Sequence, residues 1–277
     1  TWPSLQALVG DPERNLLYDH LGQREDEELD LEPDCADLPY YLRGYFAWKL
    51  RLPFGYRRCT RGRGDRPPRC DALRSHLEPG RGVDPVTSAS IFLRRDVKSS
   101  VHSASARTLP TDDDTDVYPV PLARRHLAPG TVFADPYGHL LVVAKWIPQG
   151  LDGAGALIGA DAQPDGTVGR RRFWRGSFLF TPATDEVGAG FHAWRPVVFD
   201  PREGTVDVPD NRALARPGAA VHPYSRDQYA GSREDFYGRM EALISPRPLP
   251  PEGRLRALVD AFGEQVERRV VSVDNGE

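Results

Sequence analysis

The pattern of hydrophobic and polar positions changes at Asp34 and predicts the first long element of the chain. Residues 1–33 form a lead-in that ends in an acidic run, REDEELDLEPD, which is typical of a solvated segment. After this run, apolar side chains recur at helical spacing and predict an amphipathic helix of about 14 residues, with Asp34 or Asp37 as its N-cap. The apolar positions of this helix are Leu38, Tyr41, Leu42, Tyr45, Phe46, Trp48 and Leu50.

The middle of the chain has the shorter period of β-strands. Two apolar runs at 139–146 and 155–162 are separated by turn residues, which predicts an antiparallel hairpin. Further short runs extend this pattern, so we expect an antiparallel sheet at the centre of the protein. The additional candidate strands lie at 52–59, 171–180, 191–200 and 204–210.

The C-terminal part returns to helical spacing. Ser232 resembles an N-cap, and two amphipathic segments follow it, both expected to cover the core. Their apolar faces contain Phe236, Met240, Leu243 and Ile244, and then Leu255, Leu258, Val259, Phe262 and Val266. We therefore expect an α+β domain over residues 1–222, with a long polar insert at about 60–125, and a helical extension over 223–277 packed on the same domain.

Composition narrows the class of protein. The 277 residues are 39% hydrophobic and 27% charged, and no run of about 18 apolar residues occurs, which predicts a globular chain without a membrane span. A net charge of −4 argues against a nucleic-acid partner. Histidine pairs with metal-ligand spacing, a phosphate-binding glycine loop and a GxSxG serine motif are all absent from the sequence, so we expect neither a metal nor a cofactor.

Three cysteines occur, and two of them are close in sequence. Cys59 and Cys70 bracket an Arg- and Gly-rich loop that a disulfide would close easily, and such a bond would favour an exported, periplasmic or extracellular protein. The alternative is a pair of free thiols in a reducing cytoplasm. Cys35 is the thiol left over in either case.

Cys35 stands where a nucleophile can be activated. The N-terminus of the predicted helix offers the positive end of its dipole and free backbone N–H groups. These N–H groups can also stabilise the oxyanion of a tetrahedral intermediate. Cys35 is therefore a candidate nucleophile, and the alternative is a thiol that only fills the core.

The predicted hairpin supplies a candidate base. A symmetric register about the loop 147–153 pairs residue 146 with 154 and His139 with Asp161. Directly opposed residues have Cβ atoms about 5 Å apart, so Asp161 can orient the His139 ring for general-base catalysis. A slip of one residue would separate the two side chains. The alternative is that both simply end their strands as polar edge residues.

Two segments carry a resemblance to a known family. PDCADLPYYLRGYFAWKLRLPFGYR resembles the nucleophile helix of NlpC-type cell-wall peptidases, and LAPGTVFADPYGHLLVVAKW resembles the motif that contains their catalytic histidine. The resemblance implies a papain-like fold with a nucleophile helix packed on an antiparallel sheet. It makes Cys35 the nucleophile, His139 the base and Asp161 the residue that orients the base, and it places Tyr18 near the oxyanion.

The sequence departs from that family at several motif positions. Ala36 and Asp37 replace its Ser-Gly pair, and Thr131 replaces an aspartate. The chain order Cys, His, Asp is also similar to that of transglutaminase-like proteins. Three functions therefore stay open: a thiol hydrolase of amide or isopeptide bonds in peptidoglycan peptides, an acyl transferase, and a catalytically silent peptide-binding module. Residues expected to contact a peptide substrate are Tyr18, Tyr41, Tyr137, Gln163 and Trp174.

Overall fold

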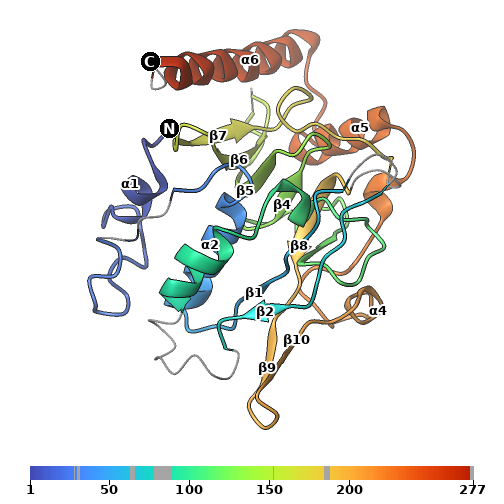
Figure 1. Ribbon diagram of the computed structural model, residues 1–277. Coiled ribbons are helices and arrows are strands. Elements are labelled where there is room, and N and C mark those ends of the chain that lie inside the picture. The colour runs from blue at the N-terminus through green and yellow to red at the C-terminus, as the bar shows by residue number, and fades with distance from the viewer. Residues whose placement is uncertain are drawn as a thin grey trace.

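An antiparallel sheet of six strands forms the centre of the protein in the computed structural model (Figure 1). The structure describes residues 1–27, 29, 32–62, 66–77, 89–151, 153–183 and 188–274. The strand order is β3-β8-β4-β5-β6-β7, and each neighbouring pair is antiparallel. The expectation of a mixed α+β chain with an antiparallel sheet is confirmed. The strands are β3 (Val117–Pro119), β4 (Val132–Ala134), β5 (Leu140–Ile147), β6 (Ala156–Ala162), β7 (Val168–Arg172) and β8 (Gly190–Trp194).

The hairpin of β5 and β6 is confirmed, but its predicted register is wrong. Val142 pairs with Ala160, so the residue numbers of paired positions sum to 302, whereas the symmetric register required a sum of 300. A bulge between Val143 and Lys145 separates this register from the one at the turn, where Ile147 pairs with Ala156. The difference at the open end of the hairpin is two residues, which leaves the side chains at that end on the expected face, whereas the difference near the turn is three.

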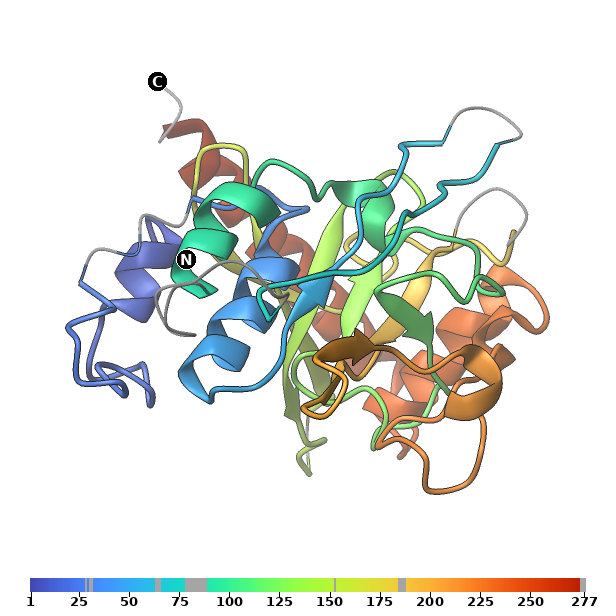
Figure 2. The same cartoon turned by 60° about the horizontal axis from the view of Figure 1, so that its bottom comes forward.

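Helices cover both faces of the sheet (Figure 2). On one face lie α1 (Leu5–Val9) and α2 (Leu38–Lys49), whose buried side chains include Tyr40, Tyr41 and Tyr45. On the other face, α5 (Arg233–Ile244) buries Phe236, Tyr237 and Met240 against the sheet. Ser232 caps α5 as expected, in a capping box with Asp235.

Several sequence-based boundaries change in the structure. The candidate strand at 171–180 is wrong beyond Arg172, where a turn follows β7. The candidate strand at 191–200 divides between β8 and β9 (Val198–Asp200), and β9 pairs with β10 (Thr205–Asp207) outside the main sheet. The remaining short elements are β1 (Gly55–Tyr56), β2 (Arg74–Ser75), the π-helical turn η1 (Phe92–Val97), the 3-10 turns η2 (Ser103–Ala106) and η3 (Asp227–Tyr229), and α4 (Asn211–Leu214).

The segment expected to be a polar insert contributes to the fold. Within 60–125, β3 forms one edge of the sheet, and Phe92, Leu93 and Val97 are buried in the core beside α2. Residues 63–65 and 78–88 of this segment lie outside the described residues. The insert is therefore structural in its second half, because its few apolar side chains are concentrated there.

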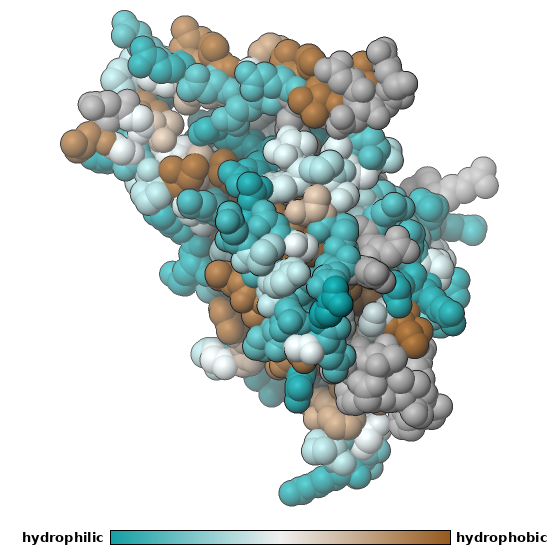
Figure 3. Space-filling model, turned by 90° about the vertical axis from the view of Figure 1, so that its left-hand side faces the viewer, coloured by the Kyte–Doolittle hydropathy of each residue, from teal (hydrophilic) through white to brown (hydrophobic). Residues whose placement is uncertain are grey.

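The last helix, α6 (Pro251–Asp274), does not cover the core in the way that its pattern predicted. Leu255, Leu258 and Phe262 are each more than half exposed, and brown apolar side chains lie on the upper surface of α6 in Figure 3. Contact with the sheet is made instead through Ala261 and through the ion pair of Glu264 with Arg172. No helix in the described ranges has both the length and the hydropathy that a membrane span requires.

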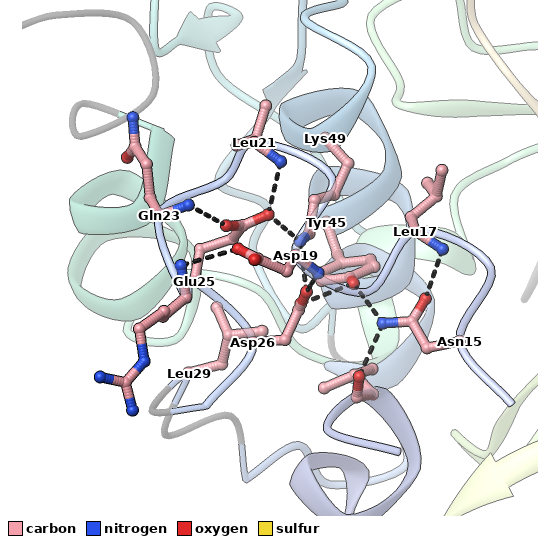
Figure 4. A network of polar contacts seen from close by, with 12 residues as sticks. Asn15, Leu17, Asp19, Leu21, Gln23, Glu25, Asp26, Leu29, Tyr45 and Lys49 are labelled. Carbon is pink, nitrogen blue, oxygen red and sulfur yellow. Dashed lines mark hydrogen bonds and ion pairs between the residues drawn. The ribbon is translucent and has the colours of Figure 1, made fainter. Parts of the chain in front are cut away.

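The acidic lead-in is anchored by buried charges (Figure 4). Lys49, at the end of α2, is fully buried and contacts both Glu25 and Asp26. Burial alone would raise the pKa of Glu25, but hydrogen bonds from Lys49 and backbone N–H groups lower it to about 2. Asp26 also accepts a hydrogen bond from the Tyr45 hydroxyl at 2.7 Å. The expectation of a fully solvated lead-in is wrong, because two of its carboxylates neutralise a lysine inside the protein.

Replacing Lys49 should strongly destabilise the fold. Lys49→Ala would leave Glu25 and Asp26 buried without their cation, so we expect a loss of about 3 kcal/mol or more in the free energy of unfolding. Arg14→Ala is the matched control, because it removes only a surface pair with Asp11 and should cost less than about 1 kcal/mol. Urea denaturation measures both values, and equal losses would contradict a structural role for the buried pair.

Candidate active site

Cys35 lies in a helical turn that leads directly into α2. Asp34 shapes this turn, because its Oδ1 accepts hydrogen bonds from the backbone N–H groups of Ala36 (2.7 Å) and Asp37 (3.0 Å). The Leu38 N–H donates to the Asp34 carbonyl and begins the helical hydrogen-bond pattern. The Cys35 side chain is half-buried and is the free thiol of the chain. The predicted position at the helix N-terminus is therefore confirmed.

The same turn determines which backbone donors remain for a ligand. Two N–H groups, those of Ala36 and Asp37, already donate to the Asp34 carboxylate. The N–H of Cys35 has no acceptor in the part of the chain that the structure describes. One backbone donor is thus available beside the sulfur for an oxyanion.

His139 is held by a tight loop immediately before β5. Oδ1 of the buried Asp135 accepts three backbone hydrogen bonds, from Tyr137 (2.8 Å), Gly138 (2.7 Å) and His139 (2.9 Å). Gly138 adopts a φ of +107°, which favours glycine, and its α-carbon faces Ser103 so closely that a β-carbon would lie 3.0 Å from the hydroxyl oxygen. This loop fixes the backbone from which the imidazole projects.

The structure brings His139, Asp161 and Cys35 together. His139 Nε2 lies 2.7 Å from Oδ2 of the fully buried Asp161, and the Cys35 side chain lies close enough to the imidazole to raise its pKa. Because Nε2 faces the carboxylate, Nδ1 is the ring nitrogen left for the sulfur. His139 and Asp161 meet diagonally across the open end of the hairpin, since the actual register shifts them two positions from direct opposition.

The electrostatics of the site favour a protonated imidazole. Burial by itself lowers the pKa of His139, but the hydrogen bonds with Asp161 and Cys35 and the charge of Asp161 raise it to about 9. Arg171 opposes this effect through its own positive charge. The His139 ring can therefore hold a proton at neutral pH while it contacts the sulfur.

Asp161 is itself fixed by two further donors. Its Oδ2 accepts hydrogen bonds from Nε2 of Gln163 (2.8 Å) and from Nε of Arg171 on β7. Arg171 compensates the buried carboxylate, and its side chain is 18% exposed. Gln163 was expected to contact substrate, but its amide nitrogen is engaged in orienting Asp161.

Three other residues expected to contact substrate, Tyr41, Trp174 and Tyr137, differ in their exposure and in their distance from the site. The prediction that Tyr41 contacts substrate is wrong, because its side chain is fully buried in the hydrophobic core to which α2 contributes. Trp174 lies in the turn after β7 and packs against Phe262 of α6. Tyr137 is 84% exposed in the loop before His139 and is the aromatic residue best placed to meet a ligand.

Tyr18 lies in a loop that is anchored far from the sulfur. Asn15 donates to the Tyr45 hydroxyl at 2.7 Å, and Glu25 contacts Lys49, so the loop is held against the second half of α2. Tyr45 is ten residues beyond Cys35, which corresponds to about 15 Å along a helix. Among the described contacts none joins Tyr18 to His139 or Cys35, so its suggested place near the oxyanion receives no support.

The disulfide between Cys59 and Cys70 is confirmed. It closes the Arg- and Gly-rich loop, and the carbonyl of Cys59 is hydrogen-bonded to Nε2 of His102 at 2.7 Å. His102 caps η2, which includes the Ser103 that faces Gly138. The disulfide loop therefore supports the region behind the His139 loop. The described residues contain no cluster of three metal-ligating side chains.

Sequence reasoning named Asp34 as a candidate cap, and its carboxylate does accept backbone N–H groups of this turn. It missed two other residues that build the site. Asp135 precedes a Pro-Tyr-Gly turn, so it had a local signal. Arg171 had none, because its relation to Asp161 follows from the pairing of β6 with β7, and that register could not be obtained from spacing alone.

The pKa of His139 is directly testable. Asp161→Asn removes the carboxylate charge beside Nε2, so the pKa of His139 should fall from about 9 by at least about one pH unit, or about 1.4 kcal/mol, as measured by NMR titration of the ring protons. Because the folded-state pKa lies above the ordinary 6.5, the stabilisation is complete below pH 6.5 and is lost as the pH rises through 9. The stability cost of Asp161→Asn should therefore be larger at pH 6 than at pH 10. An unchanged titration would contradict the contact.

Comparison with known proteins gives no match to this chain. No protein-family model matches the chain, and no curated protein or solved structure matches it either. The papain-like resemblance accordingly rests on the residues around Cys35 and His139 that first indicated it. The contact of Cys35, His139 and Asp161 is the observation from which a function has to be argued.

Proposed function

We propose that the chain is a papain-like thiol hydrolase that cleaves an amide or isopeptide bond. The observation that carries this proposal is the continuous contact from the Cys35 side chain through the His139 imidazole to the Asp161 carboxylate. A nucleophile, a base and a group that orients the base form the arrangement that covalent acyl chemistry requires. The three residues come from the turn before α2, the loop before β5 and strand β6, so this contact arises from the tertiary fold.

The residues can divide one acyl-transfer reaction into two steps. The Cys35 thiol gives its proton to His139, whose raised pKa favours the imidazolium. The Cys35 sulfur then attacks the carbonyl carbon of the amide to give a tetrahedral oxyanion beside the Cys35 N–H. Collapse of this intermediate breaks the C–N bond, and the His139 imidazolium gives its proton to the leaving amine. Water, deprotonated by His139, then attacks the thioester, releases the carboxylic acid and restores the thiol.

Asp161 supports both steps without contacting the substrate. Its carboxylate accepts a hydrogen bond from the Nε2–H group, which orients Nδ1 toward the sulfur and stabilises the imidazolium. Gln163 and Arg171 hold the carboxylate in place, and their N–H groups supply hydrogen bonds that the buried Asp161 would otherwise make to water. The raised pKa of His139 is the expected consequence of this arrangement.

The resemblance to NlpC-type enzymes implies peptides of the cell wall as substrates. Peptidoglycan fragments are therefore the first substrates to test, and exported placement is part of the same proposal. The disulfide of Cys59 with Cys70 supports export, since such bonds persist in oxidising compartments.

A silent peptide-binding module is the second candidate, and one observation favours it. The Asp34 carboxylate occupies the N–H groups of Ala36 and Asp37, which leaves a single backbone donor for an oxyanion at this turn. Removal of an oxyanion donor commonly costs an enzyme about 100-fold or more in rate. The reactivity of the thiol distinguishes the two candidates.

Alkylation of Cys35 should be fast and should depend on His139. Cys59 and Cys70 are bonded to each other, so iodoacetamide has one target in the native protein. We expect the rate at pH 7 to exceed that of glutathione by at least tenfold and to fall to the glutathione rate in His139→Ala. Mass spectrometry follows the labelling, and circular dichroism checks the fold. Slow labelling of folded wild-type protein would support the silent module instead.

Turnover should follow the assigned roles. On peptidoglycan fragments, Cys35→Ala should abolish release of new amino groups, His139→Ala should do nearly the same, and Asp161→Ala should retain residual activity because Asp161 only orients the base. Tyr41→Phe is a suitable control, since the buried ring remains and no reacting group changes. A parallel assay with a labelled amine tests acyl transfer, and incorporation in preference to hydrolysis would identify a transglutaminase-like enzyme.

A further inference from the structure

A large cavity lies beside α2, apart from the candidate active site. Its volume is about 1310 Å³, above the upper end of the usual range for small-molecule sites. The floor is the face of the sheet that carries Val142, Ile158 and Ala160, and the walls come from α1, α2 and α6. Figure 1 shows α6 along the top of the view above β7, with α1 and α2 beside the sheet. None of Cys35, His139 and Asp161 lines this cavity.

The surface of the cavity combines hydrocarbon with positive charge. Leu5, Leu38, Leu42 and Phe46 contribute apolar side chains from α1 and α2. Among the described lining residues, five side chains are cationic and two, Glu264 and Glu267, are anionic. The cationic residues are Arg14, Arg43, Lys145, Arg170 and Arg172.

Arg43 has the most unusual environment of these cations. Arg14 pairs with Asp11, Arg172 pairs with Glu264, and the Arg170 guanidinium lies over the Trp2 ring. Arg43 is largely buried, and within the described ranges it has no hydrogen-bond acceptor and no ion-pair partner. Burial lowers its pKa, which reflects the cost of keeping a guanidinium away from water. An anion that entered the cavity would offset this cost.

The neighbours of Arg43 restrict what that anion can be attached to. Pro39, Leu42 and Phe46 surround it on the same side of α2 and line the cavity with it. The floor is a sheet face, whose backbone groups are already paired between strands, so a bound peptide would find few partners for its own N–H and C=O groups. A hydrocarbon chain has no such groups to satisfy.

We propose that this cavity binds a single-chain anionic lipid, with the acyl chain on the sheet face and the carboxylate at Arg43. The proposal concerns a second site, and it is independent of any reaction at Cys35. It accounts for both properties of the cavity, because an apolar ligand alone would leave Arg43 uncompensated and a small anion alone would leave the apolar floor uncovered.

Binding of dodecanoate to the full chain tests the proposal. Trp2 and Trp194 line the cavity, so tryptophan fluorescence can report binding, with calorimetry as a second measurement. We expect saturable binding, at least tenfold weaker binding of uncharged 1-dodecanol, and a tenfold or greater loss of dodecanoate affinity in Arg43→Gln. The exposed Arg212→Gln on α4 is the matched control and should bind as the wild type does.

Two further variants keep the test decisive. Ala160→Trp places a large side chain on the floor and should reduce binding of dodecanoate while leaving Arg43 unchanged. Cys35→Ala should bind normally, which separates this site from the thiol chemistry. Absence of saturable binding, equal binding of the alcohol, or full affinity in a folded Arg43→Gln protein would each overturn the proposal.

Discussion

The contact between His139 and Asp161 is the interaction on which the candidate active site depends. It joins the start of β5 to the end of β6, and it places a buried carboxylate behind a partly exposed imidazole. Burial of a carboxylate is costly unless donors surround it, and His139, Gln163 and Arg171 provide those donors on one oxygen. The same contact raises the pKa of His139 and directs the other ring nitrogen toward Cys35. Orientation and protonation of the base therefore have one physical origin.

The predicted register of the hairpin is wrong by an even number of residues at its open end, so the predicted meeting of His139 with Asp161 still occurs. Side chains on a strand alternate between faces, so a displacement of two residues preserves the face, whereas a displacement of one reverses it. The actual register differs from the symmetric one by two at the open end, and the bulge after Val143 absorbs the odd residue near the turn. His139 and Asp161 then meet diagonally, which the length of the two side chains permits.

Buried charge has a second role at the other end of α2. Lys49 enters the interior only with Glu25 and Asp26, which ties the lead-in to the helix that begins beside Cys35. At the start of the same helix, Asp34 uses its carboxylate to organise the turn that carries the thiol. Arg43, between these two ends, has no comparable partner among the described side chains, and it faces the large cavity. One helix thus connects the lead-in, the candidate nucleophile and the proposed lipid site.

The sequence by itself determined the features that depend on local periodicity and turn chemistry. These are the helix after Asp34, the face on which His139 and Asp161 lie, and the closeness in sequence of Cys59 and Cys70, whose bonding the sequence left open. Only the tertiary structure decided which side chains are buried or meet over long separations. Tyr41 and Leu255 both belong to amphipathic helical patterns, yet the first is buried and the second exposed, because burial depends on whether another element packs against that face. Arg171 reaches Asp161 and Cys35 reaches His139 for the same reason: strand pairing and helix packing set these distances, and neither is encoded in the spacing of any one segment.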